Sequence, residues 1–343
     1  MISRAPARGA APERFSPVIR TSRAAWQGDR RRLAAALLAA LTPLALAAGG
    51  GDGHPPGSFV AVAGARLWVE SEGQGAGSPL VLIAGGPGLA HDYFHPFFSS
   101  LAATTRLVYY DAAGRGRSDK LATYSFSRDV EDLEALRQAL GLHAMSLFGH
   151  SYGGMVAVAY ALRHPAAVER LIVADTHWSG ASWQASNDAC NARIRQELPE
   201  EWTLLVRLRA QGLKSNALGD AYRTPPGFYF YQRAHPPMPG TALAVNPAVY
   251  YAIAGDDADF ELGGELARLD LRTRMKELKM PLMILAGRHD QVVPVERALA
   301  AKALAPRAEL LVLEQSGHFP FVEETDTTMA AIRRFLATGS VGR

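Results

Sequence analysis

The stretch Gly149-His150-Ser151-Tyr152-Gly153 decides the fold of this chain. It follows an apolar run at 145–148 and precedes a helix-like run at 154–163. A serine on so sharp a turn has strained backbone angles, and glycine neighbours let strand and helix approach closely. In this context the G-x-S-x-G pattern predicts that Ser151 is an activated nucleophile. The alternative is a serine in an ordinary strand-to-helix turn.

The rest of the chain alternates between short apolar runs and helical patterns. An antiparallel pair of strands is predicted within 58–70, with its turn at Gly64. Further strands are predicted at 79–84, 107–110, 145–148, 171–174, 282–286 and 309–313. The continuous apolar runs at 79–84 and 107–110 are expected to be buried on both faces. Helices are predicted at 127–140, with Ser127 as N-cap, near 295–304 and near 326–336. This alternation indicates an α/β protein with a mostly parallel sheet.

The region 177–269 breaks the alternation, with several tryptophans and tyrosines and two proline pairs. It is predicted to be a helical cap inserted after the sixth strand, over the edge where parallel sheets bind ligands. The lone cysteine, Cys190, lies in this cap and excludes an intrachain disulfide. The predicted organisation is a leader and linker at 1–54, a first core segment at 55–176, the cap at 177–269 and a second core segment at 270–343.

The net charge of +3 is unevenly distributed. Residues 1–47 hold eight arginines against Glu13 and Asp29, a net +6, so the remainder carries −3. We therefore expect no nucleic-acid partner. Arginines at 30–32, an uncharged run at 33–48 and small residues at its end are typical of an export signal. We expect a periplasmic or secreted protein. An uncleaved membrane anchor and a cytoplasmic protein with an unstructured extension are the alternatives.

A nucleophilic serine needs a base, and the base needs an orienting acid. His318 follows a predicted strand and is our candidate base, and Asp290 follows the strand at 282–286 and is our candidate acid. The order Ser, Asp, His is that of the α/β-hydrolases. Asp175, which follows another strand, is the rival acid. Asp111 is interpreted as a carboxylate that hydrogen-bonds loop N–H groups beside the site.

Two backbone N–H groups must also hold the charge that develops on the attacked carbonyl oxygen. Tyr152, the residue after the nucleophile, is predicted to supply one of them, and Gly86 in the glycine-rich loop 85–88 the other. No Lys-Ser/Thr pair follows this loop, which disfavours a phosphate-binding loop. There is no zinc-type spacing of Cys and His, so we expect neither a metal nor a cofactor.

These motifs together resemble the proline iminopeptidase branch of the α/β-hydrolases over residues 57–338. The resemblance rests on the loop 85–88, the pattern at 111–118, the Ser151 turn, and the segments 287–290 and 317–318. It implies release of an N-terminal residue, often proline, from small peptides or amides. It also implies a negative site for the substrate amine, in which Asp259 matches the first expected acid. Gln291 stands at the second position and is uncharged.

Other departures are Ala84 in place of the usual His, and alanines at 112–113 in place of Gln-Arg. They affect amine recognition and leave the predicted triad intact. Two functions therefore remain open for a small-molecule or short-peptide substrate: an aminopeptidase, and an esterase or lactonase of the same fold. A third hypothesis is a non-hydrolytic, binding use of the fold. The sequence indicates no oligomeric state.

Overall fold

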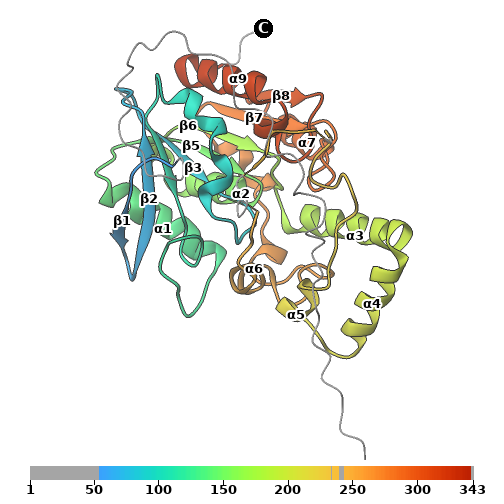
Figure 1. Ribbon diagram of the computed structural model, residues 1–343. Helices are drawn as coiled ribbons and strands as arrows, with labels where there is room; N and C mark the ends of the chain where they lie inside the picture. Colours follow the sequence, from blue (N-terminus) through green and yellow to red (C-terminus); the bar gives the residue numbers. More distant parts are fainter. Residues whose placement is uncertain (1–53, 233, 239–242, 341–343) are drawn as a thin grey trace, which may run out of the picture. The chain divides into compact units, whose positions relative to one another are not determined.

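The computed structural model describes residues 54–232, 234–238 and 243–340 (Figure 1). These residues lie in the unit Ala48–Arg343, and the other unit of the chain, Met1–Ala47, falls outside them. The export signal predicted in the leader is therefore also outside the described residues. No helix within the described ranges is long and apolar enough to cross a membrane.

An eight-stranded sheet forms the core, in the order β1-β2-β4-β3-β5-β6-β7-β8. The β1–β2 and β2–β4 pairs are antiparallel, and the other pairs are parallel. The strands are β1 (Gly57–Val62), β2 (Ala65–Glu72), β3 (Leu80–Ile83), β4 (Leu107–Tyr110), β5 (Met145–His150), β6 (Val168–Ala174), β7 (Leu282–Gly287) and β8 (Glu309–Leu313). The first two form a hairpin at Gly64, as its position in the sequence predicted.

Helices cover both faces of the sheet (Figure 1). Side chains of β3 alternate between two apolar clusters, one shared with α1, α2 and α7 and the other with α9. A strand buried on both faces reads as a continuous apolar run, which is why these strands were visible in the sequence. The helices of the core are α1 (Phe126–Ala139), α2 (Tyr152–Arg163), α7 (Glu296–Leu304), α8 (Pro320–Glu323) and α9 (Thr325–Thr338).

The N-cap of helix α1 lies two residues earlier than predicted. It is Ser125, whose side chain accepts a hydrogen bond from the N–H of Arg128, and not Ser127. Ser127 instead donates its N–H and hydroxyl to the carboxylate of Glu265. The intervening Phe126 decides between the two serines, because its ring is buried in the first turn of the helix, against the ring of Tyr152.

The described part of the connection between β6 and β7 contains four α-helices: α3 (Gly180–Glu197), α4 (Pro199–Ala210), α5 (Ser215–Gly219) and α6 (Pro247–Ala254). In Figure 1 they run from yellow-green to orange. This insertion has an apolar cluster of its own, which includes Cys190, Ile194 and Phe228. The described residues also form short 3-10 segments: η2 (His91–Phe94), η3 (Phe97–Leu101), η4 (Pro165–Ala167), η5 (Leu266–Arg268) and η6 (Arg272–Glu277).

Candidate active site

Ser151 occupies a one-residue turn between β5 and α2. Its φ of 54° and ψ of −121° lie in a region that residues with a side chain rarely adopt. The flanking glycines make this turn possible. A Cβ on Gly149 would lie 2.4 Å from the carbonyl oxygen of Gly153, and one on Gly153 would lie 2.1 Å from that of Ile83. Strand and helix therefore pack at distances that only glycine permits.

His318 and Asp290 meet at the carboxyl end of the sheet. The imidazole Nδ1 of His318 lies 2.8 Å from Oδ2 of Asp290, and both side chains are buried. The other carboxylate oxygen of Asp290 accepts the N–H groups of Val292 at 2.8 Å and Val293 at 2.9 Å. These bonds fix the carboxylate, which in turn orients the ring so that Nε2 is the free nitrogen.

Asp175, the rival acid, lies at the end of β6 with a φ of 48°. Its Oδ1 accepts the N–H of Gly287 at 2.8 Å, and so ties the end of β6 to the end of β7. Burial and the neighbouring charge of Asp290 raise the pKa of Asp175 well above its usual range. The geometry therefore pairs His318 with Asp290 and gives Asp175 a structural role between the two strand ends.

Both residues predicted to donate to the oxyanion lie near Ser151: Tyr152 follows it in the chain, and Gly86 lines the same pocket. Gly86 has a φ of 114°, and a Cβ there would lie 2.3 Å from the nitrogen of Gly88. Tyr152 is the first residue of α2, so the helix itself does not use its N–H. The phenol of Tyr152 is buried and donates to Asp129 at 2.6 Å, which leaves only the backbone of this residue for the site.

His150 connects three parts of the site beneath the turn. Its Nε2 lies 2.8 Å from the carbonyl oxygen of His318, and its Nδ1 lies 3.0 Å from the hydroxyl of Tyr93. That hydroxyl accepts the N–H of Gly85 at 2.9 Å. Burial and the nearby His318 lower the pKa of His150 well below its usual range. A neutral ring with its proton on Nε2 satisfies every group in this chain of hydrogen bonds.

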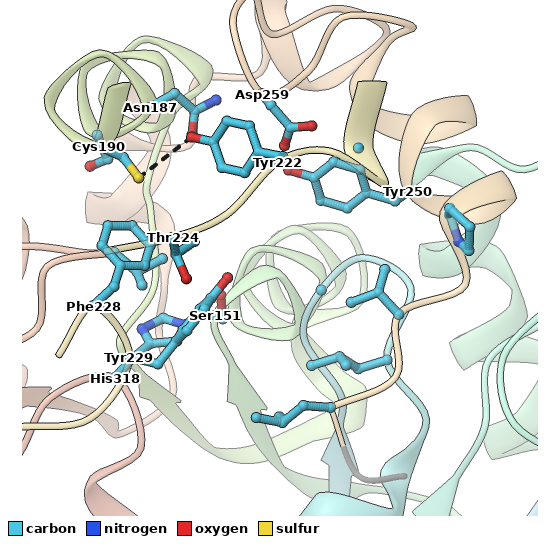
Figure 2. Close-up of a pocket in the computed structure, with 18 of the residues that line it drawn as sticks. Ser151, Asn187, Cys190, Tyr222, Thr224, Phe228, Tyr229, Tyr250, Asp259 and His318 are labelled. Carbon is cyan, nitrogen blue, oxygen red and sulfur yellow. Dashed lines mark hydrogen bonds between the residues drawn. The ribbon is translucent and has the colours of Figure 1, made fainter. Parts of the chain in front are cut away.

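A pocket of about 540 Å³ opens above these residues, between the core and the insertion. Figure 2 shows the Ser151 side chain beside the His318 imidazole, with Asp259 across the pocket near Tyr222 and Tyr250. Gly86 also lines the pocket. The remaining lining is largely aromatic and apolar, as in most small-molecule sites.

The two residues proposed to bind the substrate are placed differently. Asp259 lines the pocket, and its Oδ2 accepts the hydroxyl of Tyr251 at 2.6 Å. Burial raises the pKa of Asp259 above its usual value. Gln291 is exposed, donates to the carbonyl of Gly227 at 3.3 Å and does not line the pocket. The tight turn after Asp290 brings Val292, and not Gln291, into the lining.

A strand-turn-helix serine, a buried His–Asp pair and an inserted set of helices over a mostly parallel sheet indicate one family. The alpha/beta hydrolase fold family matches residues 78–325. The chain belongs to the α/β-hydrolase family. The predicted fold is therefore confirmed, and so is the prediction of a serine hydrolase that resembles the proline iminopeptidases.

Relatives of this α/β-hydrolase carry more than one name. The proline iminopeptidase of Heyndrickxia coagulans is 28% identical over 287 residues, which cover 81% of this chain and 97% of that protein. The pimeloyl-[acyl-carrier protein] methyl ester esterase of Aliivibrio salmonicida is 28% identical over 277 residues, which cover 79% and 95%. The crystal structure of VinJ has a TM-score of 0.70 at 26% identity, and covers 83% of this chain and 99% of its own.

Sequence reasoning missed several residues of this α/β-hydrolase. Asp220 lines the pocket at an exposed position, and no local pattern marks it. Arg115 is buried, pairs with Asp129 and donates to the carbonyl of Pro87, and so supports the loop that carries Gly86. Asp111 accepts the N–H groups of His91 and Arg117, which agrees with its interpretation as a loop carboxylate.

The described residues hold one group of side chains arranged to bind a metal ion: His54, Glu70, His91 and His95. None of the four lines the pocket. They come from three separate segments, and the one sequence signal among them is the H-x3-H spacing of His91 and His95, which is common in zinc sites but weak by itself.

Proposed function

We propose that this chain is an aminopeptidase that releases an N-terminal residue, proline in particular, from small peptides or amides. The observation that carries the proposal is the half-buried carboxylate of Asp259, which lines the same pocket as Ser151 and His318. A substrate with a free amine could contact Asp259 while its first carbonyl lies at Ser151. The relatives named proline iminopeptidase support this assignment.

The proposed mechanism uses the groups already described. His318 Nε2 takes the hydroxyl proton of Ser151, and the oxygen attacks the carbonyl carbon of the substrate. The N–H groups of Gly86 and Tyr152 hold the oxyanion. His318 then gives its proton to the leaving amine, and water releases the acyl group through the same steps in reverse.

Asp259 is suited to a cationic amine because of its surroundings. Burial raises its pKa because the ionised carboxylate is poorly solvated there. A cationic amine bound beside it would therefore stabilise the ionised form. The hydroxyl of Tyr251 holds one oxygen at 2.6 Å and limits the directions from which an amine can approach. An ionic hydrogen bond at such a site contributes about 1.5–3 kcal/mol, or roughly 10–100-fold in KM.

The test is a paired panel of proline arylamide, N-acetylproline arylamide and short-chain aryl esters, with Ser151→Ala as the inactive control. We expect the free-amine arylamide to be the best substrate, and Asp259→Asn to raise its KM about 10–100-fold. Asp220→Asn is the matched control, because an exposed carboxylate in the same pocket contributes little. Cleavage of proline arylamide no faster than by Ser151→Ala rejects the aminopeptidase.

A second candidate is an esterase or lactonase that uses the same triad. Two observations favour it. Gln291 is uncharged and exposed, so the second acid expected near the amine is missing beside Asp259. One relative is named as an esterase. The panel separates the two functions. An esterase hydrolyses the aryl esters, is indifferent to N-acetylation, and keeps its KM in Asp259→Asn.

A further inference from the structure

Three imidazoles surround one carboxylate on the core, apart from the pocket. Oxygen Oε2 of Glu70 lies 3.1 Å from Nδ1 of His54, 3.1 Å from Nε2 of His91 and 3.5 Å from Nε2 of His95. All four donor atoms lie within 4.8 Å of one another. The side chains of Glu70 and His91 are fully buried, that of His95 is 5% exposed, and that of His54 is 12% exposed.

The separations from Glu70 are close to those in a tetrahedral metal site. Zinc binds imidazole nitrogen at about 2.0–2.1 Å and carboxylate oxygen at about 2.0–2.2 Å, so neighbouring donors in a tetrahedron lie about 3.3–3.5 Å apart. The three separations from Glu70 bracket that range. Small rotations of the rings would complete the geometry.

The surrounding residues orient the donors toward a common centre. Nδ1 of His91 lies 2.8 Å from the carboxylate of Asp111, so Nε2 faces the group. Oε1 of Glu70 accepts the indole N–H of Trp68 at 2.8 Å and a guanidinium N–H of Arg117 at 2.9 Å, which leaves Oε2 facing the rings. A carboxylate behind a histidine is the usual outer partner of a metal-binding imidazole.

Hydrogen bonds alone do not account for the group. Within the described ranges, Nε2 of His91 and Nε2 of His95 are buried nitrogens without a hydrogen-bond partner. Buried polar atoms are almost always satisfied, and one that is not needs an explanation such as a bound ion. A single carboxylate oxygen also has too few lone pairs to accept from three ring N–H groups at once.

We propose that His54, Glu70, His91 and His95 bind one divalent transition-metal ion of the zinc type. Imidazole and carboxylate donors suit zinc, and four protein ligands close the coordination shell, which is typical of a structural site. The ion would join the segment before β1, strand β2 and the 3-10 segment η2. Because η2 follows the loop that carries Gly86, the ion would also anchor that loop.

The test uses the full chain without a polyhistidine tag, stripped with a chelator, reloaded with Zn²⁺ and freed of excess metal. Metal content and the thermal unfolding midpoint are measured. We expect about one zinc per chain, and a midpoint that rises on reloading. His54→Ala and His95→Gln should lose both effects. His143→Ala, an exposed histidine outside the group, is the matched control and should keep them.

Two further measurements keep the proposal falsifiable if a variant folds poorly. Labelling of Ser151 with a fluorophosphonate probe and circular dichroism report whether each variant is folded. Asp111→Asn keeps the ligands and should weaken zinc binding about 10–100-fold. Substitution by Co²⁺ should give the strong visible absorption of four-coordinate cobalt. Stripped wild type that takes up no zinc, or uptake equal in folded His95→Gln and His143→Ala, overturns the proposal.

Discussion

The exchange Asp290→Asn tests the proposed triad most sharply, because the structure dictates how the new amide must lie. Oδ1 of Asp290 accepts two backbone N–H groups, and Oδ2 accepts Nδ1–H of His318. An asparagine has one accepting oxygen. If that oxygen stays with the two N–H groups, the amide NH2 faces Nδ1 and forces the ring proton onto Nε2. His318 then has no lone pair for the proton of Ser151.

The size of the effect follows from the two possible amide orientations. The flipped amide would restore the bond to His318 but leave two buried N–H groups facing an NH2, at about 1–3 kcal/mol each. The unflipped amide is therefore favoured and holds the wrong tautomer. In a Ser-His-Asp triad this lowers kcat by about 10⁴, or roughly 5.4 kcal/mol. We expect KM to change little, because Asp290 does not line the pocket.

Asp175→Asn is the matched control. Burial and the charge of Asp290 raise the pKa of Asp175 and so favour its neutral form, for which an amide is a nearly isosteric replacement. Its amide oxygen can still accept the N–H of Gly287. We expect kcat/KM on the best substrate of the panel to stay within about 3-fold of wild type. A loss below 10-fold in Asp290→Asn, or an equal loss in Asp175→Asn, would refute this assignment.

Three other outcomes are expected. Gly153→Ala should lower the free energy of unfolding, measured by urea titration, by about 2–3 kcal/mol or more, because the added Cβ would meet a backbone carbonyl. Gly77→Ala is the control: its Cβ would lie in open space, and the free energy of unfolding should change by less than about 0.5 kcal/mol. Burial and nearby positive charge lower the pKa of His177 to about 3, so the folded state loses stability as pH falls below about 6.5. His177→Gln should therefore reduce the loss of unfolding free energy between pH 7 and pH 5 by about 2 kcal/mol. A variant that loses as much stability as wild type over this pH range contradicts the prediction. Deletion of residues 1–47 should shift the protein from the exported to the cytoplasmic fraction on cell fractionation, and unchanged export would contradict the leader prediction.

Most of the sheet could be predicted because a strand covered on both faces must be apolar along its whole length. The run at 107–110 coincides with β4, which is buried throughout, and the run at 309–313 coincides with β8, whose first four residues are half-buried. The turn at Ser151 could be predicted because its glycines are required by contacts that a Cβ would violate. The start of α1 could not, because Ser125 and Ser127 have equal capping chemistry and the burial of Phe126 selects between them.

Residues that meet only through the tertiary structure escaped prediction for a different reason. Of the four residues His54, Glu70, His91 and His95, only His91 and His95 have a ligand-like spacing, and the proximity of the whole group depends on the packing of η2 against β2. The position of Gln291 likewise depends on a turn stabilised by Asp290, which directs the neighbouring Val292 into the pocket. A pattern can indicate that a loop reaches the site, but the dihedral angles within the loop decide which side chain enters it.

The insertion also helps to position the base. The N–H of His318 donates to the carbonyl of Tyr229 at 2.7 Å, and a Cβ on Gly317 would lie 2.7 Å from the same oxygen. From the core side, His150 holds the carbonyl of His318 at 2.8 Å. The backbone of the base is thus clamped between the two layers that enclose the substrate. Changes in the segment around Tyr229 that alter the pocket should therefore also alter kcat, because substrate selection and proton transfer share one backbone contact.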